Sequence, residues 1–189
     1  MFGYQKYLEN VSDNKPLAEN GLIIPYANTP GRKTETAKTV YQSMIERSTK
    51  YVHIMTPYFV VEREFLDSMR YAAQRGVEVS MILPHIPDKK TVYYLARTYY
   101  PELLKAGIKV YEYTPGFIHA KCFVSDDESA VVGTVNLDYR SFYHHFECGA
   151  CFYRNEVVAQ AEKDFRHTLE ECREVTMDYY KKIPVYQKV

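Results

Sequence analysis

The sequence predicts an α/β protein, an α/β/α sandwich around a mixed central sheet. Segments with helical and strand periodicity alternate through residues 36–113. Several strand-like segments then follow one another before a last long amphipathic helix. Alternation favours parallel strands joined by helices, whereas successive strands favour antiparallel pairing. Together the two patterns predict a mixed sheet with helices on both faces.

Each predicted helix has an apolar face or an end signal. The first, over residues 36–50, places Ala37, Tyr41 and Ile45 on one side. A helix that begins near Thr91 is interrupted or restarted at Pro101. Another helix is predicted over residues 62–75, and it ends before Gly76. The last helix begins after a cap at Asn155, and its apolar face consists of Val158, Ala161, Phe165, Leu169 and Cys172. The predicted strands are residues 51–56, 77–83, 108–113, 118–124, 129–133 and 146–153.

Composition is consistent with one core. The chain has 189 residues, 46% of them hydrophobic, which is near the size of a single domain. Its 24 basic and 24 acidic residues cancel, so no global field attracts nucleic acid or an anionic bilayer. No apolar run approaches the roughly 18 residues of a membrane helix, and residues 1–6 lack a signal-peptide pattern. The chain itself is therefore expected to be soluble.

The most informative motif is HAKCFVSD at residues 119–126, followed at fixed offsets by Gly133-Thr134-Val135-Asn136 and by Glu147. Strand residues alternate between faces, so His119 and Lys121 project from the same face of the predicted strand. An edge strand with a solvent-facing His and Lys would explain this pair but not the downstream residues. The set predicts a phosphate site.

These side chains have complementary roles at a phosphorus centre. A neutral His119 can act as nucleophile or proton donor, and Glu147 is a suitable partner for its far ring nitrogen. Lys121 supplies a point charge, while the Thr134 hydroxyl and Asn136 amide donate hydrogen bonds to phosphoryl oxygens. No metal or cofactor is required by this set.

Asp126 completes the candidate catalytic set with His119, Lys121 and Glu147. Its turn-like setting, Ser125-Asp126-Asp127-Glu128, favours a structural hydrogen bond. Proton transfer is the other interpretation, and the residues alone leave both open.

The pattern HxKxxxxD, six further residues and GTxN resembles the signature of the phospholipase D superfamily. Residues 56–59, 76–84 and 136–147 narrow the resemblance to the second lobe of cardiolipin synthases, over about residues 21–175. Thr134 stands where many members carry Ser, and His145 where many carry Asn. The resemblance implies an α/β/α phospholipase D-like catalytic lobe over residues 34–189, with a basic and aromatic tail, entered by a connector over residues 1–33.

Members of this superfamily bring two such motifs together, and this chain has one. The resemblance therefore implies a missing N-terminal lobe or a homodimer. It also implies phosphatidyl transfer through a phosphohistidine, with phosphatidylglycerol or another phospholipid as substrate. The complete protein would lie at the cell membrane, with this lobe on its cytoplasmic side. The alternative is a homodimeric single-motif phosphodiesterase or nuclease, although neutral net charge counts against nucleic acid.

Aromatic residues are bunched in two places that the motif does not explain. Tyr93, Tyr94, Tyr99 and Tyr100 lie on one predicted helix, and residues 179–188 mix tyrosines with lysines. Both patterns fit either ordinary packing and a solvated terminus or contact with lipid headgroups. Tyr58 follows a predicted strand, where it could border an acceptor pocket.

Overall fold

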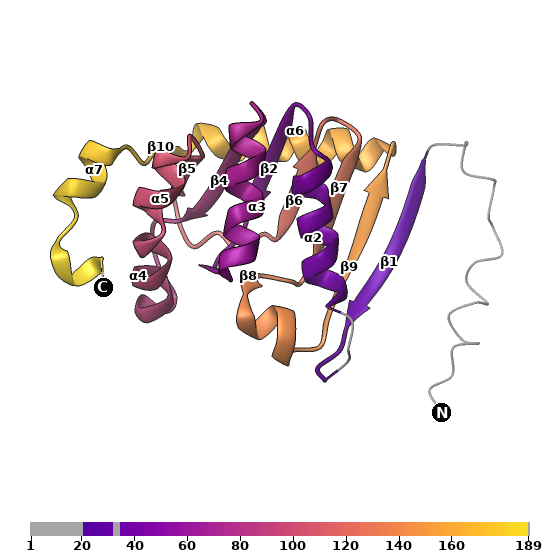
Figure 1. Cartoon of the computed structure of the whole chain (residues 1–189), viewed down its shortest axis with the longest axis horizontal. Coiled ribbons are helices and arrows are strands. Elements are labelled where there is room, and N and C mark those ends of the chain that lie inside the picture. Colours follow the sequence, from indigo (N-terminus) through magenta and orange to yellow (C-terminus); the bar gives the residue numbers. More distant parts are fainter. Residues whose placement is uncertain (1–20, 32–34, 189) are drawn as a thin grey trace.

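The computed structural model describes residues 21–31 and 35–188, and its centre is an eight-stranded mixed sheet. Strands β2, β4 and β5 pair in parallel, and all the other neighbours in this sheet are antiparallel. The sheet therefore confirms the predicted fold class (Figure 1). In spatial order the strands are β1 (Leu22–Asn28), β9 (Glu147–Tyr153), β7 (Ser129–Gly133), β6 (Cys122–Ser125), β2 (Tyr51–Met55), β4 (Glu78–Pro84), β5 (Lys109–Tyr113) and β10 (Cys172–Glu174).

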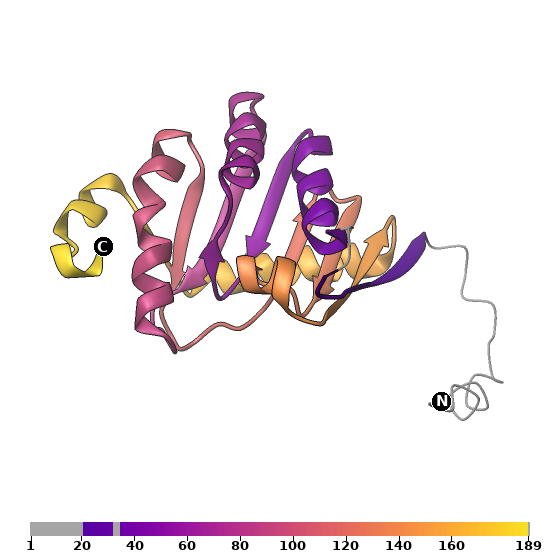
Figure 2. The ribbon, with the colours of Figure 1, turned by 60° about the horizontal axis from the view of Figure 1, so that its bottom comes forward.

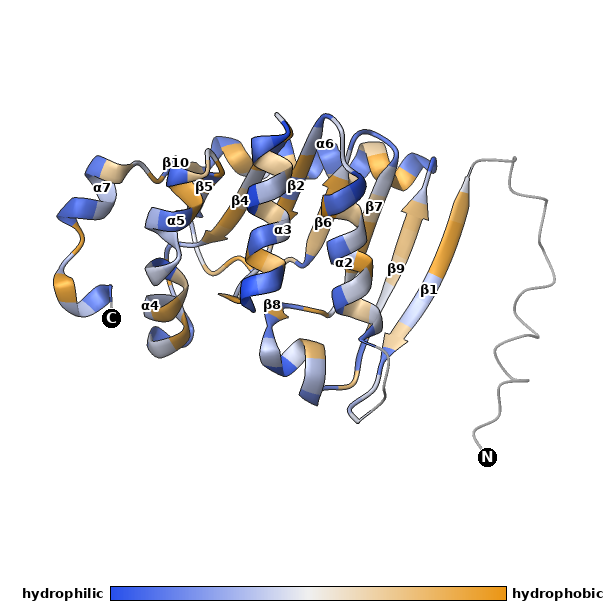
Figure 3. Ribbon diagram, viewed as in Figure 1, coloured by the Kyte–Doolittle hydropathy of each residue, from blue (hydrophilic) through white to orange (hydrophobic). Residues whose placement is uncertain are grey.

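Helices cover both faces of this sheet. One face carries α2 (Thr36–Arg47), α3 (Arg63–Gln74) and α5 (Tyr100–Lys105), and the other carries α6 (Glu156–Glu170) (Figures 1 and 2). The apolar faces of α2 and α3 contribute Tyr41, Ile45, Phe65 and Met69, all fully buried, to the larger core cluster. The central strands are mainly hydrophobic because both of their faces are covered (Figure 3).

The structure differs from the sequence prediction at both edges of the sheet. β1 falls within the expected connector, yet it pairs with β9 from Leu22↔Tyr153 to Asn28↔Glu147. An edge strand tolerates Pro25, which cannot donate a backbone hydrogen bond. At the other edge, Cys172 was expected in the last helix, but α6 ends at Glu170 and β10 pairs with β5. If the helix continued through Cys172, the backbone N–H and C=O groups on this edge of β5 would lack the hydrogen bonds that β10 provides.

Two short segments connect the core to the motif region. β3 (Phe59–Val60) and β8 (Leu137–Asp138) form a separate parallel pair, and the Leu137 N–H donates to Thr56 Oγ1 at 3.3 Å. The π-helix η2 (Arg140–His144) follows β8, and Asn28 Nδ2 donates to the carbonyls of Ser141 and Phe142 (3.1 and 2.8 Å). These contacts fix the segment after the GTxN motif against β1 and β2.

The remaining helices lie at the β10 end of the molecule. They are α4 (Lys90–Thr98), α7 (Met177–Lys182) and the 3₁₀ turn η3 (Val185–Gln187). The predicted interruption before Pro101 is confirmed, because α4 ends at Thr98 and α5 begins at Tyr100. In the part of the chain that the structure describes, none of the helices combines the length and apolarity needed to cross a membrane.

Candidate active site

His119 and Lys121 precede β6, which begins at Cys122 rather than at the expected residue 118. The Gly133 N–H donates to the Lys121 carbonyl at 3.3 Å, so this segment still runs beside β7. His119 is exposed, whereas the Lys121 side chain is mostly buried and its Nζ donates to the His119 carbonyl at 2.7 Å. The structure thus places an exposed histidine next to a largely buried lysine.

The electrostatic surroundings favour the neutral form of His119. Partial burial and the positive charge of Lys121 lower the pKa of the imidazole, while the Asp88 carboxylate acts in the opposite direction. Burial also lowers the pKa of Lys121, opposed by the charges of Glu147, Asp138 and Asp88. A neutral ring can serve as a nucleophile at neutral pH.

Glu147, itself buried, is the centre of a hydrogen-bond network whose outer members Thr134 and His145 are exposed. Its carboxylate accepts hydrogen bonds from the Thr134 hydroxyl and, at 2.9 Å, from the Ser141 hydroxyl. It also lies 3.5 Å from His145 Nδ1. Ser141 also accepts from the backbone N–H and side-chain Nδ2 of Asn136, both at 3.2 Å. The network holds four of the residues in the GTxN and Glu147 region in fixed positions.

Glu147 has other partners in this structure than the sequence predicts. Glu147 was expected to orient the His119 ring, but within the described residues the Glu147 carboxylate contacts Thr134, Ser141 and His145. The negative charge of Glu147 raises the pKa of Lys121, so this carboxylate acts on the lysine charge.

Asp126 is not part of this cluster. It follows β6, at the end opposite Lys121, and its carboxylate accepts the backbone N–H groups of Thr49, Lys50 and Tyr51 at 2.7, 2.9 and 2.9 Å. These hydrogen bonds outweigh partial burial and lower the pKa of Asp126. The geometry favours the structural interpretation of the motif's last residue.

A groove of about 530 Å³ opens beside the cluster. Its apolar lining includes Val60, Val92 and Leu95, and Lys89 and Arg140 supply positive charge. Such a combination suits a ligand with an anionic group and an apolar portion. Tyr58, Asn136, Asp138, Tyr139 and His145 complete the lining.

Tyr58 borders this groove, as its position after a strand predicts. Its hydroxyl donates to Asp88, and the Lys89 ammonium lies 5.5 Å from its ring centroid. Its ring lies 6.5 Å from that of Phe117, which in turn lies 5.5 Å from the His119 ring. The aromatic contacts join the groove to the histidine.

Sequence reasoning missed Ser141 and Asp138 as parts of the site. Ser141 is fully buried, and its N–H donates to Asp138 Oδ1 at 2.7 Å. The signal was available, because a polar Asp-x-x-Ser unit lies between two site residues at a turn. Asp88 and Lys89 could not have been found this way, since they reach the site from a distant loop.

A family model described as "Cardiolipin synthase, PLD-like domain" matches residues 41–169. The chain belongs to the PLD-like domain family of cardiolipin synthases. It is 39% identical over 163 residues to "Cardiolipin synthase 2" of Bacillus cereus, covering 86% of this chain and 32% of that protein. It is 44% identical over 173 residues to an "Uncharacterized protein" of Streptococcus mutans, and this match covers 92% of this chain and 38% of that protein. This PLD-like chain thus spans about a third of these relatives.

The architecture of this PLD-like lobe also occurs in a solved structure. Nuc from Salmonella typhimurium, described as a phospholipase D family member, aligns with a TM-score of 0.67 at 15% identity. The match covers 80% of this chain and 99% of that one. A single PLD-like lobe is therefore the fold that the chain adopts.

Proposed function

We propose that this chain is one half of a two-histidine phosphatidyltransferase that forms cardiolipin from two phosphatidylglycerol molecules. The observation that carries the proposal is an imidazole with a lowered pKa beside the buried Lys121. Its ring is joined through the rings of Phe117 and Tyr58 to an apolar groove with cationic residues. The other half would be a second HxKxxxxD lobe, either in the same protein or in a second copy of this chain. The complete enzyme would act at the cell membrane, with this lobe on the cytoplasmic side.

In the proposed reaction, one histidine attacks the phosphorus of the phosphatidyl donor and forms a P–N bond. The bond from phosphorus to the leaving glycerol oxygen breaks, and the opposing histidine gives that oxygen a proton. The hydroxyl of the second phosphatidylglycerol then attacks phosphorus and transfers its proton to the opposing histidine. The P–N bond breaks and the first histidine is regenerated. His119 takes one of these two roles.

The neighbouring groups would stabilise charge on the phosphoryl oxygens. Lys121 is the point charge, and its burial strengthens its interaction with an anion. Asn136, positioned by Ser141, is the neutral donor, and Thr134, whose one hydroxyl hydrogen goes to Glu147, borders the phosphate site and holds that carboxylate in place. Each side chain is already held in place, so little reorganisation accompanies the reaction.

A chimera tests the proposal. The matching third of the Bacillus cereus "Cardiolipin synthase 2" is replaced by this chain, and cardiolipin formation from phosphatidylglycerol is measured. We expect the chimera to form cardiolipin, and we expect this activity to fall at least about a thousandfold in the His119→Ala or Lys121→Ala variant. Asn136→Ala should remove one hydrogen-bond donor and so reduce the stabilisation of the transition state by about 2 to 4 kcal/mol. The exposed Lys163→Ala is the control. Equal activity with and without the His119 imidazole, or a folded but inactive chimera, would contradict the proposal.

A homodimeric phosphodiesterase is the second candidate. It is favoured by the match over 99% of a solved chain that is itself a single lobe. Dimeric phosphodiesterase activity of the isolated chain on nucleic acid, weakening steeply with salt, would support this alternative instead.

A further inference from the structure

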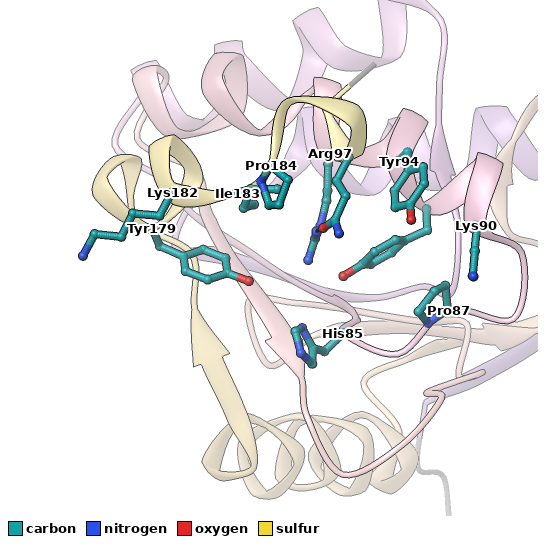
Figure 4. A pocket seen from close by; sticks show the side chains of 11 residues that line it. His85, Pro87, Lys90, Tyr94, Arg97, Tyr179, Lys182, Ile183 and Pro184 are labelled. Atoms are coloured by element: carbon teal, nitrogen blue, oxygen red, sulfur yellow. Dashed lines mark hydrogen bonds between the residues drawn. The ribbon is translucent and has the colours of Figure 1, made fainter.

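A second cavity, of about 430 Å³, lies between α4 and the C-terminal segment (Figure 4). The groove is lined by Lys89, Val92 and Leu95, whereas the second cavity is lined by other residues of α4 and by the C-terminal segment. No lining residue is shared between the two, so they are separate sites with α4 as a common wall. The lining of the second cavity includes His85, Lys90, Tyr93, Tyr94, Arg97 and Tyr179.

The inner side of this cavity is built around one fully buried carboxylate, Glu112. Arg97 donates to it through Nε and Nη2 at 3.1 and 2.8 Å, and His85 Nδ1 lies 2.9 Å away. Arg173 and the hydroxyls of Tyr179 and Tyr100 also donate to it, at 3.3, 3.1 and 3.3 Å. Burial opposes ionisation, but Arg97 and His85 outweigh it and hold the pKa of Glu112 below its usual value. Figure 4 shows Arg97, Tyr179 and His85 directed toward a common centre.

Positive charge exceeds negative charge around the cavity. Arg97 and Arg173 already share the single charge of Glu112. Lys90 and Lys182 also line the cavity, and in residues 21–31 and 35–188 neither forms an ion pair or hydrogen bond. This excess occurs in a chain whose net charge is zero. The cavity is therefore complementary to an anion.

The rim of the cavity is apolar and exposed. Ile86, next to His85, is 48% exposed. Val185 and Tyr186, in η3, are 75% and 68% exposed, and the Tyr186 ring packs edge-on at 6.5 Å from Tyr94. Aliphatic and tyrosine side chains beside lysines are the composition of segments that enter the headgroup region of a membrane. A soluble phosphate compound would need the charges but not this rim.

We propose that this cavity binds the headgroup phosphate of an anionic phospholipid, and that Ile86, Val185 and Tyr186 enter the membrane interface around it. The site anchors the lobe to the lipid surface and, through α4, presents the neighbouring groove to the same surface. The inference deepens the proposed function, because its ligand belongs to the same lipid class. Its test measures binding and not turnover, so the two proposals fail separately.

The test is co-sedimentation of the chain with vesicles of phosphatidylglycerol and phosphatidylcholine, compared with phosphatidylcholine alone. We expect preferential binding to the anionic vesicles. Lys90→Gln combined with Lys182→Gln should weaken it, roughly fivefold for each lysine removed. Val185→Ser with Tyr186→Ser should weaken it as well. Lys163→Gln and Tyr71→Ser are matched controls, because both residues are exposed and line neither the groove nor the second cavity.

NMR with a short-chain phosphatidylglycerol locates the ligand independently. Shifts concentrated in residues 85–97 and 179–187 would support the proposal. Shifts confined to the groove around Asn136 and Tyr139, equal binding to both kinds of vesicle, or the same loss in the control variants would overturn it. Binding of inorganic phosphate at these residues without vesicle binding would overturn the membrane role too, as would docking of a second lobe on this rim.

Discussion

Lys121 is the residue whose environment most directly suits phosphate chemistry. It is 8% exposed, and in the described chain its ammonium group donates to a carbonyl oxygen rather than to a carboxylate. A buried cation without a directly paired anion is unfavourable on its own and is stabilised when an anion arrives. The same charge lowers the pKa of His119. Lys121 thus favours both the ligand and the reactive form of the imidazole.

The His119 titration follows from this arrangement. A lowered pKa means that the ring loses its proton below the ordinary value of about 6.5 and that more of it is neutral at pH 7. Lys121→Gln removes the nearby positive charge, so the His119 pKa should rise. NMR spectra of the histidine ring signals, recorded across the pH range, give the His119 pKa in the parent chain and in Lys121→Gln. Lys163→Gln, the control, should leave the His119 pKa unchanged. A midpoint above 6.5 in the parent chain, or no rise in Lys121→Gln, would be inconsistent with this electrostatic account.

Ser141 gives a second prediction at the same scale. Ser141→Ala removes a donor to the buried Glu147 and the acceptor for Asn136. Leaving these groups unpaired should lower the free energy of unfolding by about 1 to 3 kcal/mol. Urea denaturation measures this free energy of unfolding. The control is Ser68→Ala, where Ser68 contacts Gln42 and Glu46 at the surface between α2 and α3, and it should change the free energy of unfolding by less than about 0.5 kcal/mol. An unchanged midpoint for Ser141→Ala would show that the network does not hold the site.

At the scale of elements, Asp126 fastens the end of β6 to the start of β2 through three backbone N–H groups. Asp126→Asn keeps a residue that tolerates the local φ of 57° but loses the charge, and should cost about 1.5 to 3 kcal/mol of stability. Because the folded pKa is lowered, the carboxylate's contribution is present above about pH 4 and declines as the pH falls. Denaturation at pH 7 and pH 3 measures both effects. Loss of catalysis in a stably folded Asp126→Asn chimera would restore a chemical role.

Gly133 sets the spacing of β7 and β9 next to Thr134. A Cβ there would lie 2.4 Å from the Cys148 carbonyl oxygen and 2.6 Å from Gly149 Cα. Gly133→Ala should therefore force the strands apart and destabilise the fold by about 1 to 3 kcal/mol. Gly116→Ala, which meets nothing within 4 Å, is the control. Thermal unfolding compares them, and equal midpoints would mean that the strands separate without cost.

The sequence predicted helices and central strands because their periodicity is local. The faces of α2, α3 and α6 depend on neighbours three or four residues apart, and so does the break before Pro101. It did not predict β1 or β10, whose strand character depends on pairing with distant edges. The motif predicts His119, Lys121, Thr134 and Asn136 in one site, and this stays a prediction. The hydrogen bond from Ser141 to Glu147 depends on how η2 folds back, which no spacing reveals.

At the scale of the whole molecule, the lobe carries one histidine motif on an otherwise complete sheet. A mechanism with two histidines needs an opposing group from outside this chain. The described fold leaves His119 exposed, where a second lobe could approach. The fraction of relatives that the chain spans, about a third, is consistent with one lobe of a larger enzyme.

Turnover of phosphatidylglycerol by the isolated chain, at concentrations where sedimentation shows it to be monomeric, tests this central claim most directly. A half site lacks the opposing acid or nucleophile and is open where the partner would exclude water. The account predicts turnover no greater than that of His119→Ala, with activity appearing only when a second HxKxxxxD lobe is supplied. Robust turnover by the verified monomer, abolished by His119→Ala, would contradict it by showing that the site is complete within one lobe.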